Sequence, residues 1–161
     1  MNQKTISTLL AALLLAAGAY AQGRKSFDDA DQKELFNYVL SMDKVRKLSA
    51  ATKALEPLAK QHPEIQKDTD DAKSIDALVG KFQKYPDAVA VLAKNGLTPR
   101  EYIVGLMTTM QAGMAVGFKK SGAIKEYPPE MLKTVSKTNL DFVEQHWDEF
   151  QKLAQMSSDD K

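Results

Sequence analysis

The stretch Ile103–Phe118, IVGLMTTMQAGMAVGF, holds sixteen residues and no charged side chain. Charges flank it directly, with Arg100 and Glu101 before it and Lys119 and Lys120 after it. A helix on the surface of a globular protein carries charge along one side. Because this stretch is apolar or small around nearly its whole circumference, it predicts the buried central helix of a small bundle.

The residues before this stretch form a helix start. Thr98 is typical of an N-cap, and Pro99 is typical of the first helical position. Glu101 can bond back to Thr98, which completes a capping box. We therefore predict that the central helix begins at Thr98 and ends at Gly122.

The rest of the chain has apolar residues at helical spacing with turn residues between them. Long helices are predicted over about residues 26–55 and 136–155, and shorter ones over about 74–84, 86–95 and 130–135. Pro57 and Pro86 are predicted to divide helices. No repeat and no useful strand-like alternation is present. The predicted fold is all-α, an up-and-down helical bundle of about four main helices plus one or two short helices.

Residues 1–21 have the pattern of a cleaved signal peptide. Lys4 is followed by an apolar run, Ile6–Ala17, and by the small-x-small motif of Ala19, Tyr20 and Ala21. The run is shorter than the roughly 20 apolar residues of a membrane span, so no stable membrane insertion is expected after cleavage. The sequence predicts export to the periplasm or the medium. It also predicts a single helical domain over residues 22–161, with flexible ends at 22–26 and 157–161.

The composition excludes several classes of protein. The chain has no cysteine, which excludes disulfides and thiolate metal sites. It has 22 basic and 21 acidic residues, and loss of Lys4 with the leader makes the two numbers equal. This balance gives no electrostatic basis for binding nucleic acid. No nucleophile elbow, phosphate-binding glycine loop or zinc-protease motif occurs, so we expect no enzyme activity.

Two stripes of side chains run along the central stretch at helical angles. One consists of methionines: Met107, Met110 and Met114. The other consists of small residues: Gly105, Thr109, Gly113 and Gly117. Each interior glycine costs about 1 kcal/mol relative to alanine, so we expect something to lie close to this backbone. Close packing of a neighbouring helix is one interpretation, and a groove for a flat ligand or tetrapyrrole beside Gly113 and Gly117 is the other.

The methionines and one histidine also permit metal chemistry. Thioethers bind Cu(I), so the Met107, Met110 and Met114 stripe is a candidate copper site, although methionine is also a common core filler. His146 falls inside the apolar arc of the last helix, and Met42 falls on the apolar face of the first. This pairing resembles the axial ligands of haem-binding four-helix bundles of the cytochrome b562 type. The other interpretation of His146 is a core histidine with a hydrogen-bond partner.

Two segments resemble small exported bacterial proteins without an assigned function. They are Gly96–Tyr102, GLTPREY, and Asn139–His146, NLDFVEQH. The resemblance implies an exported α-helical module and transfers no site residues. We predict an exported, non-enzymatic binding or interaction module without a committed cofactor, whose partner is a protein or a small apolar ligand. The alternative is a haem or copper carrier.

Overall fold

The computed structural model describes residues 27–62 and 72–156. Within these ranges the chain is all-α, as predicted, with eight helices and no strand. In chain order they are α2 (Asp29–Asn37), α3 (Met42–Gln61), α5 (Ile75–Phe82), α6 (Pro86–Lys94), α7 (Pro99–Lys120), α8 (Pro129–Thr134), α9 (Lys137–Gln145) and α10 (Trp147–Met156). The leader predicted at 1–21 and the flexible ends predicted at 22–26 and 157–161 lie outside the described residues.

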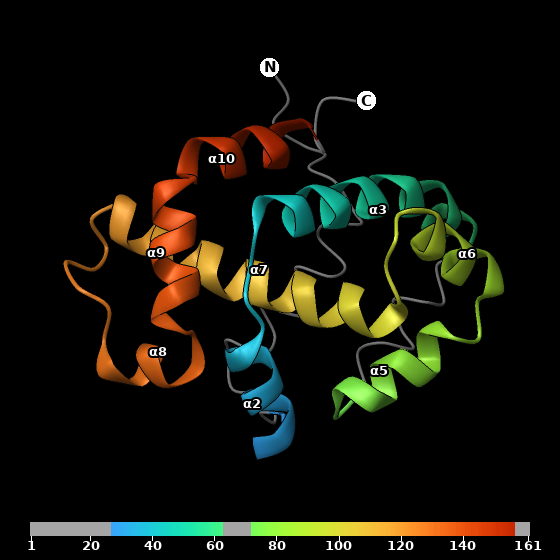
Figure 1. Cartoon of the computed structure of the whole chain (residues 1–161), viewed down its shortest axis with the longest axis horizontal. Coiled ribbons are helices and arrows are strands. Elements are labelled where there is room, and N and C mark those ends of the chain that lie inside the picture. The colour runs from blue at the N-terminus through green and yellow to red at the C-terminus, as the bar shows by residue number, and fades with distance from the viewer. Residues whose placement is uncertain (1–26, 63–71, 157–161) are drawn as a thin grey trace.

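Helix α7 runs through the middle of the molecule, and the other helices are arranged around it (Figure 1). The predicted capping box is confirmed. The Thr98 hydroxyl accepts from the Glu101 amide at 3.2 Å, and the Glu101 carboxylate accepts from the Thr98 amide at 2.9 Å. The Thr98 amide and hydroxyl together hold the pKa of Glu101 below its ordinary value. At the other end the helix stops before Gly122, which has a φ of +80°.

Two clusters of buried apolar side chains lie along α7. The cluster at its N-terminal half joins it to α2, α3, α5 and α6, and Tyr102 is its largest fully buried side chain. The cluster at its C-terminal half joins it mainly to α9, where Leu140 and Val143 are fully buried. The two halves of the central helix therefore pack against different neighbours, and they have to be considered separately.

The first predicted helix is two helices in the structure. Helix α2 ends at Asn37 and α3 begins at Met42, with an extended linker at Tyr38–Ser41 between them. The side chain of Asn139, on α9, holds this linker by two hydrogen bonds to its backbone. The predicted break at Pro57 is wrong, because α3 continues through this residue to Gln61. Pro57 is exposed, whereas Leu55 and Leu58 on either side pack into the core and keep the helix in place.

The last predicted helix is also divided. Helix α9 ends at Gln145, His146 is its C-cap, and α10 begins at Trp147. Figure 1 shows α10 running in a different direction from α9 and lying above α3. The prediction of about four main helices therefore becomes two long helices, α3 and α7, with six shorter ones around them. The predicted break at Tyr85 and Pro86 is confirmed, since Pro86 is the first residue of α6.

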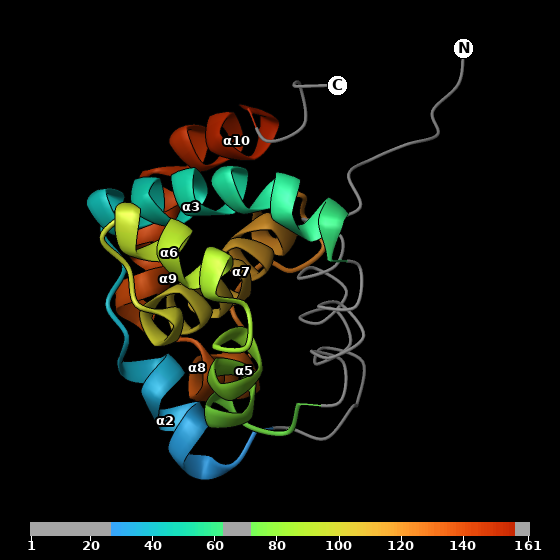
Figure 2. The same ribbon diagram turned by 90° about the vertical axis from the view of Figure 1, so that its right-hand side faces the viewer.

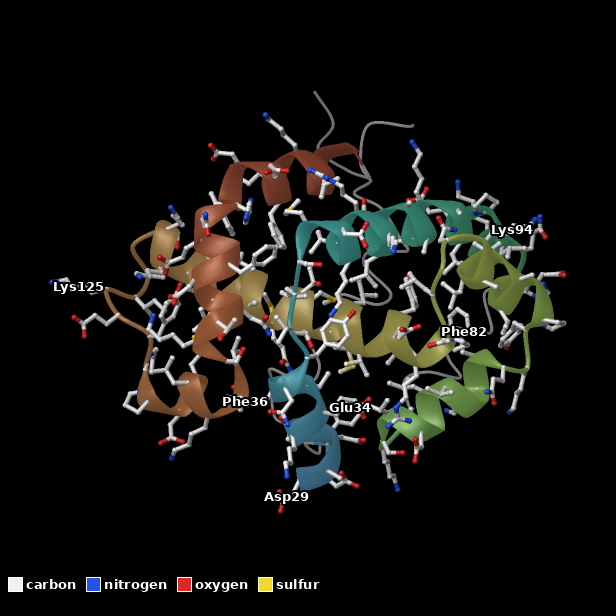
Figure 3. The ribbon with its side chains drawn as sticks, viewed as in Figure 1. Asp29, Glu34, Phe36, Phe82, Lys94 and Lys125 are labelled. Atoms are coloured by element: carbon white, nitrogen blue, oxygen red, sulfur yellow. The ribbon has the colours of Figure 1, made fainter. Side chains whose placement is uncertain are left out.

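Polar side chains fasten α2 and α5 to the start of α7. Arg100 forms ion pairs with Glu34 of α2 and Asp76 of α5. Asp31 of α2 is buried, and its carboxylate accepts from the Ile75 amide at 2.9 Å, at the start of α5. Burial raises the pKa of Asp31, and the Ile75 amide partly offsets this effect. Figure 3 shows Glu34 on the side of α2 that faces α5. One arginine and one buried acid thus join three helices.

None of the helices in the described part of the chain is both long enough and apolar enough to span a membrane. The longest of them is α7, whose central stretch contains Thr108, Thr109 and Gln111.

A buried hydroxyl pair gives a matched test of the core. The Thr52 hydroxyl donates to the Leu48 carbonyl at 2.9 Å, so the Tyr102 hydroxyl, 3.0 Å away, must be the donor of the second bond. Tyr102→Phe removes one net hydrogen bond and should lower the free energy of unfolding by about 1 kcal/mol. Thr52→Val leaves the tyrosine donor buried without an acceptor and should cost more, up to about 3 kcal/mol.

Urea denaturation of the two variants measures this difference. Burial raises the pKa of Tyr102 to about 12, so the tyrosine is neutral throughout any practical pH range and the comparison is free of titration effects. Equal losses in the two variants would contradict the assignment of Tyr102 as the donor.

Candidate functional site

The methionine stripe of α7 changes from core to surface along the helix. Ile103 and Met107, at its start, are buried, with 5% and 7% of their surface exposed. Met110 and Met114 are half-buried, and Phe118 is 50% exposed. The core interpretation therefore applies to Met107, whereas Met110 and Met114 lie where an outside molecule can reach them.

The three glycines of the small-residue stripe have three different surroundings. A side chain at Gly105 would come within 2.9 Å of the Tyr38 hydroxyl and 3.0 Å of Leu48. At Gly117 the nearest atom would belong to the Trp147 ring, at an ordinary contact distance of 3.5 Å. At Gly113 no atom of the described residues lies within 4 Å. Close helix packing therefore explains Gly105 but not Gly113.

These observations define an open face on the C-terminal half of α7. It consists of five uncharged residues: Met110, Gly113, Met114, Gly117 and Phe118. In Figure 2 the labelled helices lie above, below and to the left of α7, and α9 is among those on the left. The open face is on the side of the helix that points away from the α9 contact, because Ala112 and Val116 face α9 from the opposite side.

A group of three polar side chains closes the C-terminal end of α7. Lys119 donates to the Glu144 carboxylate at 2.7 Å, and the Tyr127 hydroxyl donates to the same oxygen. The Lys119 ammonium also lies 4.7 Å from the centre of the Tyr127 ring. Glu144 is half-buried in this group.

The electrostatics of this group suit a structural clamp better than acid–base catalysis. Lys119 and Tyr127 hold the pKa of Glu144 below its ordinary value, and burial together with Glu144 raises the pKa of Tyr127. Both shifts move the groups away from neutral pH, where a catalytic acid or base would need to titrate. We interpret the group as fixing the loop between α7 and α8 onto α9.

His146 has a hydrogen-bond partner in the structure. Its Nδ1 lies 3.3 Å from the Glu149 carboxylate, and its ring packs at a tilt of 47° against Phe142, with 4.8 Å between the ring centres. The prediction that it lies within the last helix is wrong, because it is the C-cap of α9 and 28% of its side chain is exposed. The hydrogen bond to Glu149 can form there because the chain turns into α10 at this point.

Met42 lies at a helix start instead of the middle of a helix face. It is the first residue of α3 and is half-buried, because the extended linker separates α2 from α3. Arg46, one turn later, forms an ion pair with Glu149 at 3.1 Å, and Glu149 also contacts His146. Glu149 therefore connects the elements that carry the two predicted haem ligands, through its contacts with Arg46 and His146. Among the described residues, no group of three or more histidines or acids could hold a metal ion.

Sequence reasoning did not identify Trp147 or Tyr127 as parts of this region. Trp147 borders the open face at Gly117, and Tyr127 completes the clamp. Neither residue stands in a recognisable motif, since each reaches α7 from a turn whose path the local sequence does not specify. The one available signal was the position of Tyr127 directly before Pro128 and Pro129.

The glycines give a direct test of the open face. Gly113→Ala should raise the free energy of unfolding by up to about 1 kcal/mol, because alanine favours the helix and its methyl group meets nothing. Gly105→Ala should lower it by about 1–3 kcal/mol, because Tyr38 and Leu48 are packed in the core and cannot move aside freely.

Chemical denaturation of the two variants measures both effects. Gly80→Ala is the control, since Gly80 is a helical glycine of α5 that also has nothing within 4 Å. A loss of stability in Gly113→Ala would show that other atoms cover this face.

The clamp predicts a pH dependence with a definite sign. The folded pKa of Glu144 is lowered, so its contribution to stability is present above the unfolded pKa, about 4.3, and is lost as the pH falls through the folded value. Glu144→Gln should therefore flatten the acid limb of the stability curve. Glu130→Gln, which removes only an exposed pair with Lys133, should leave the curve as it is. An unchanged acid limb in Glu144→Gln would contradict the clamp.

No family model matches the chain, and searches of curated proteins and of solved structures find no significant match. The resemblance of Gly96–Tyr102 and Asn139–His146 to exported bacterial proteins therefore stays a prediction.

Proposed function

We propose that the protein is an exported, non-enzymatic binding module that takes up an apolar partner on the open face of α7. The observation that carries the proposal is Gly113. A glycine in a helix interior costs about 1 kcal/mol relative to alanine, and no contact within the described protein explains it. A partner that comes close to the backbone at this position would supply the explanation.

The chemistry of the open face supports an apolar partner. Met110 and Met114 are flexible and polarisable side chains that adapt to different apolar shapes. Phe118 is one of four large apolar side chains exposed among the described residues. No charged residue belongs to the face, so a charged partner would find no counterion on it. The partner is therefore a small apolar ligand or the apolar side of a protein segment.

The polar surroundings support binding without catalysis. The clamp of Lys119, Tyr127 and Glu144 lies at the C-terminal end of α7, and its members bond one another. The proposal that the module works after export rests on the leader pattern of residues 1–21.

The alternative function, a haem or copper carrier, stays a prediction. Contacts of Glu149 with Arg46 and with His146 connect the elements that carry Met42 and His146, which is the support for this alternative. Against it, His146 Nδ1 already contacts Glu149. For copper, only Met110 and Met114 of the stripe are accessible, since Met107 is buried.

Nile red, an uncharged apolar dye, tests the proposed function. The protein should enhance its fluorescence, and Met114→Gln should weaken the apparent affinity about tenfold, because a polar amide replaces an apolar contact in the middle of the open face. The measurement is a fluorescence titration at fixed dye concentration.

Phe36→Gln is the matched control for this titration. Phe36 is 36% exposed and lies on the side of α2 that faces α8 (Figure 3), so it is a similarly accessible apolar residue at a different place. Equal affinities for the two variants, or no enhancement by the unaltered protein, would contradict binding at the open face.

A further inference from the structure

The break between α2 and α3 has no local cause in the sequence. The linker residues, Tyr38, Val39, Leu40 and Ser41, include neither glycine nor proline. The helical spacing of apolar residues continues through them, which is why one continuous helix is the natural prediction. The cause of the break must therefore lie in other parts of the fold.

Side chains replace the hydrogen bonds that a continuous helix would make through this region. Asn139 donates to the Tyr38 carbonyl at 2.7 Å and accepts from the Leu40 amide at 3.0 Å. Thr108 donates to the Leu35 carbonyl at 3.3 Å. In a continuous helix these three backbone groups would bond residues four positions away. Only tertiary contacts from α7 and α9 pair them in the broken form.

Two side chains close in sequence pair further backbone groups in and beside the linker. Lys44 donates to the Val39 carbonyl at 2.7 Å, and Ser41 accepts from the Lys44 amide at 3.4 Å. The last distance is long for a hydrogen bond to an amide, so this cap contributes little. Among the described residues four polar side chains are buried, and two of them serve the break: Asn139 bonds the linker, and Thr108 bonds the last turn of α2.

We propose that Tyr38–Ser41 is the hinge of a domain swap between two copies of this chain. When the linker leaves Asn139, it closes into helix and joins α2 to α3 as one helix over residues 29–61. This helix is about 50 Å long at 1.5 Å per residue, so it carries α2 away from its own α7. The α2 of each copy then packs on the α7 of the other.

A second copy is the partner because it alone offers the surface that α2 needs. Leu35 is 1% exposed in the core of the monomer and has to be buried again. The partner's α7 would present the same pocket and the same arginine for Glu34, which pairs with Arg100 in the monomer. The swap therefore regains these contacts, gains helical hydrogen bonds in the hinge, and leaves Asn139 without its linker partners.

Val39→Pro separates the two forms. Tyr38 has a φ of −70° and a ψ of 118°, the extended backbone that a residue before proline adopts. Val39 is 53% exposed, so the substitution fits the broken linker. It strongly disfavours the continuous helix, because proline lacks the amide hydrogen and its ring crowds the carbonyl four residues earlier. Pro57 is tolerated within α3, where Leu55 and Leu58 on either side pack into the core.

The test measures the dimer fraction after refolding at rising protein concentration, by size exclusion with light scattering. Asn139→Leu removes the bonds that hold the linker open and should increase the dimer fraction at least threefold over the unaltered protein. Asn139→Leu combined with Val39→Pro should remain monomeric. If Asn139→Leu does not fold, the unaltered protein at high concentration should give a dimer that Val39→Pro alone does not give.

Cross-linking identifies the exchange of α2. The chain has no cysteine, so a Glu34→Cys chain and an Arg100→Cys chain can be mixed, refolded together and treated with a short bismaleimide. A swapped dimer should yield a covalent dimer, because it places these positions from different copies side by side. A dimer that persists with Val39→Pro, a dimer without this cross-link, or strictly monomeric protein at every concentration would overturn the proposal.

Discussion

The position of α2 and α3 on opposite sides of α7 depends on two hydrogen bonds made by one amide side chain. Asn139 pairs with the backbone on both sides of Val39 and keeps that segment extended, so the chain passes α7 without winding around it. The extended segment lets α2 lie below the central helix and α3 above it (Figure 1). A buried amide with both its donor and its acceptor satisfied is a strong constraint, because either unpaired group would cost free energy.

The central helix serves two purposes along its length. Its N-terminal half is covered by four helices and holds the larger cluster of buried side chains. Its C-terminal half is covered on the α9 side and leaves Met110 and Met114 accessible. Such a division places a surface that can adapt to a partner on an element that the rest of the fold keeps rigid. Binding sites built on helices in this way keep their geometry when the surrounding loops move.

The sequence predicts the local features of this fold better than its tertiary ones. The capping box of Thr98 and Glu101 is confirmed, and so is the break before Pro86, because the residues that form each feature are neighbours in the chain. The prediction misses the breaks at Tyr38–Ser41 and at His146. The first is stabilised by Asn139, which is distant in sequence, and the second by the contact of His146 with Glu149 after the chain turns into α10. Periodicity describes the faces of a helix but not where a distant side chain interrupts it.

The candidate site was predictable in composition but not in extent. The sequence places the methionine and glycine stripes on one helix, and the structure has both on α7. The sequence could not distinguish Gly105 from Gly113, because both glycines lie in the interior of the same helix. They differ only in the side chains that tertiary packing places beside them. The same holds for Met107 and Met114, of which only the first lies in the core.

The contrast between Gly105 and Gly113 has a consequence for how such chains can vary in evolution. Gly105 faces Tyr38 and Leu48 within the fold itself, so glycine should persist there in related chains whatever they bind. Gly113 faces no part of the described chain, so selection on fold alone would let alanine or serine replace it freely. Persistence of glycine at position 113 would identify the related chains that bind the same kind of partner. It would distinguish them from chains that share only the fold.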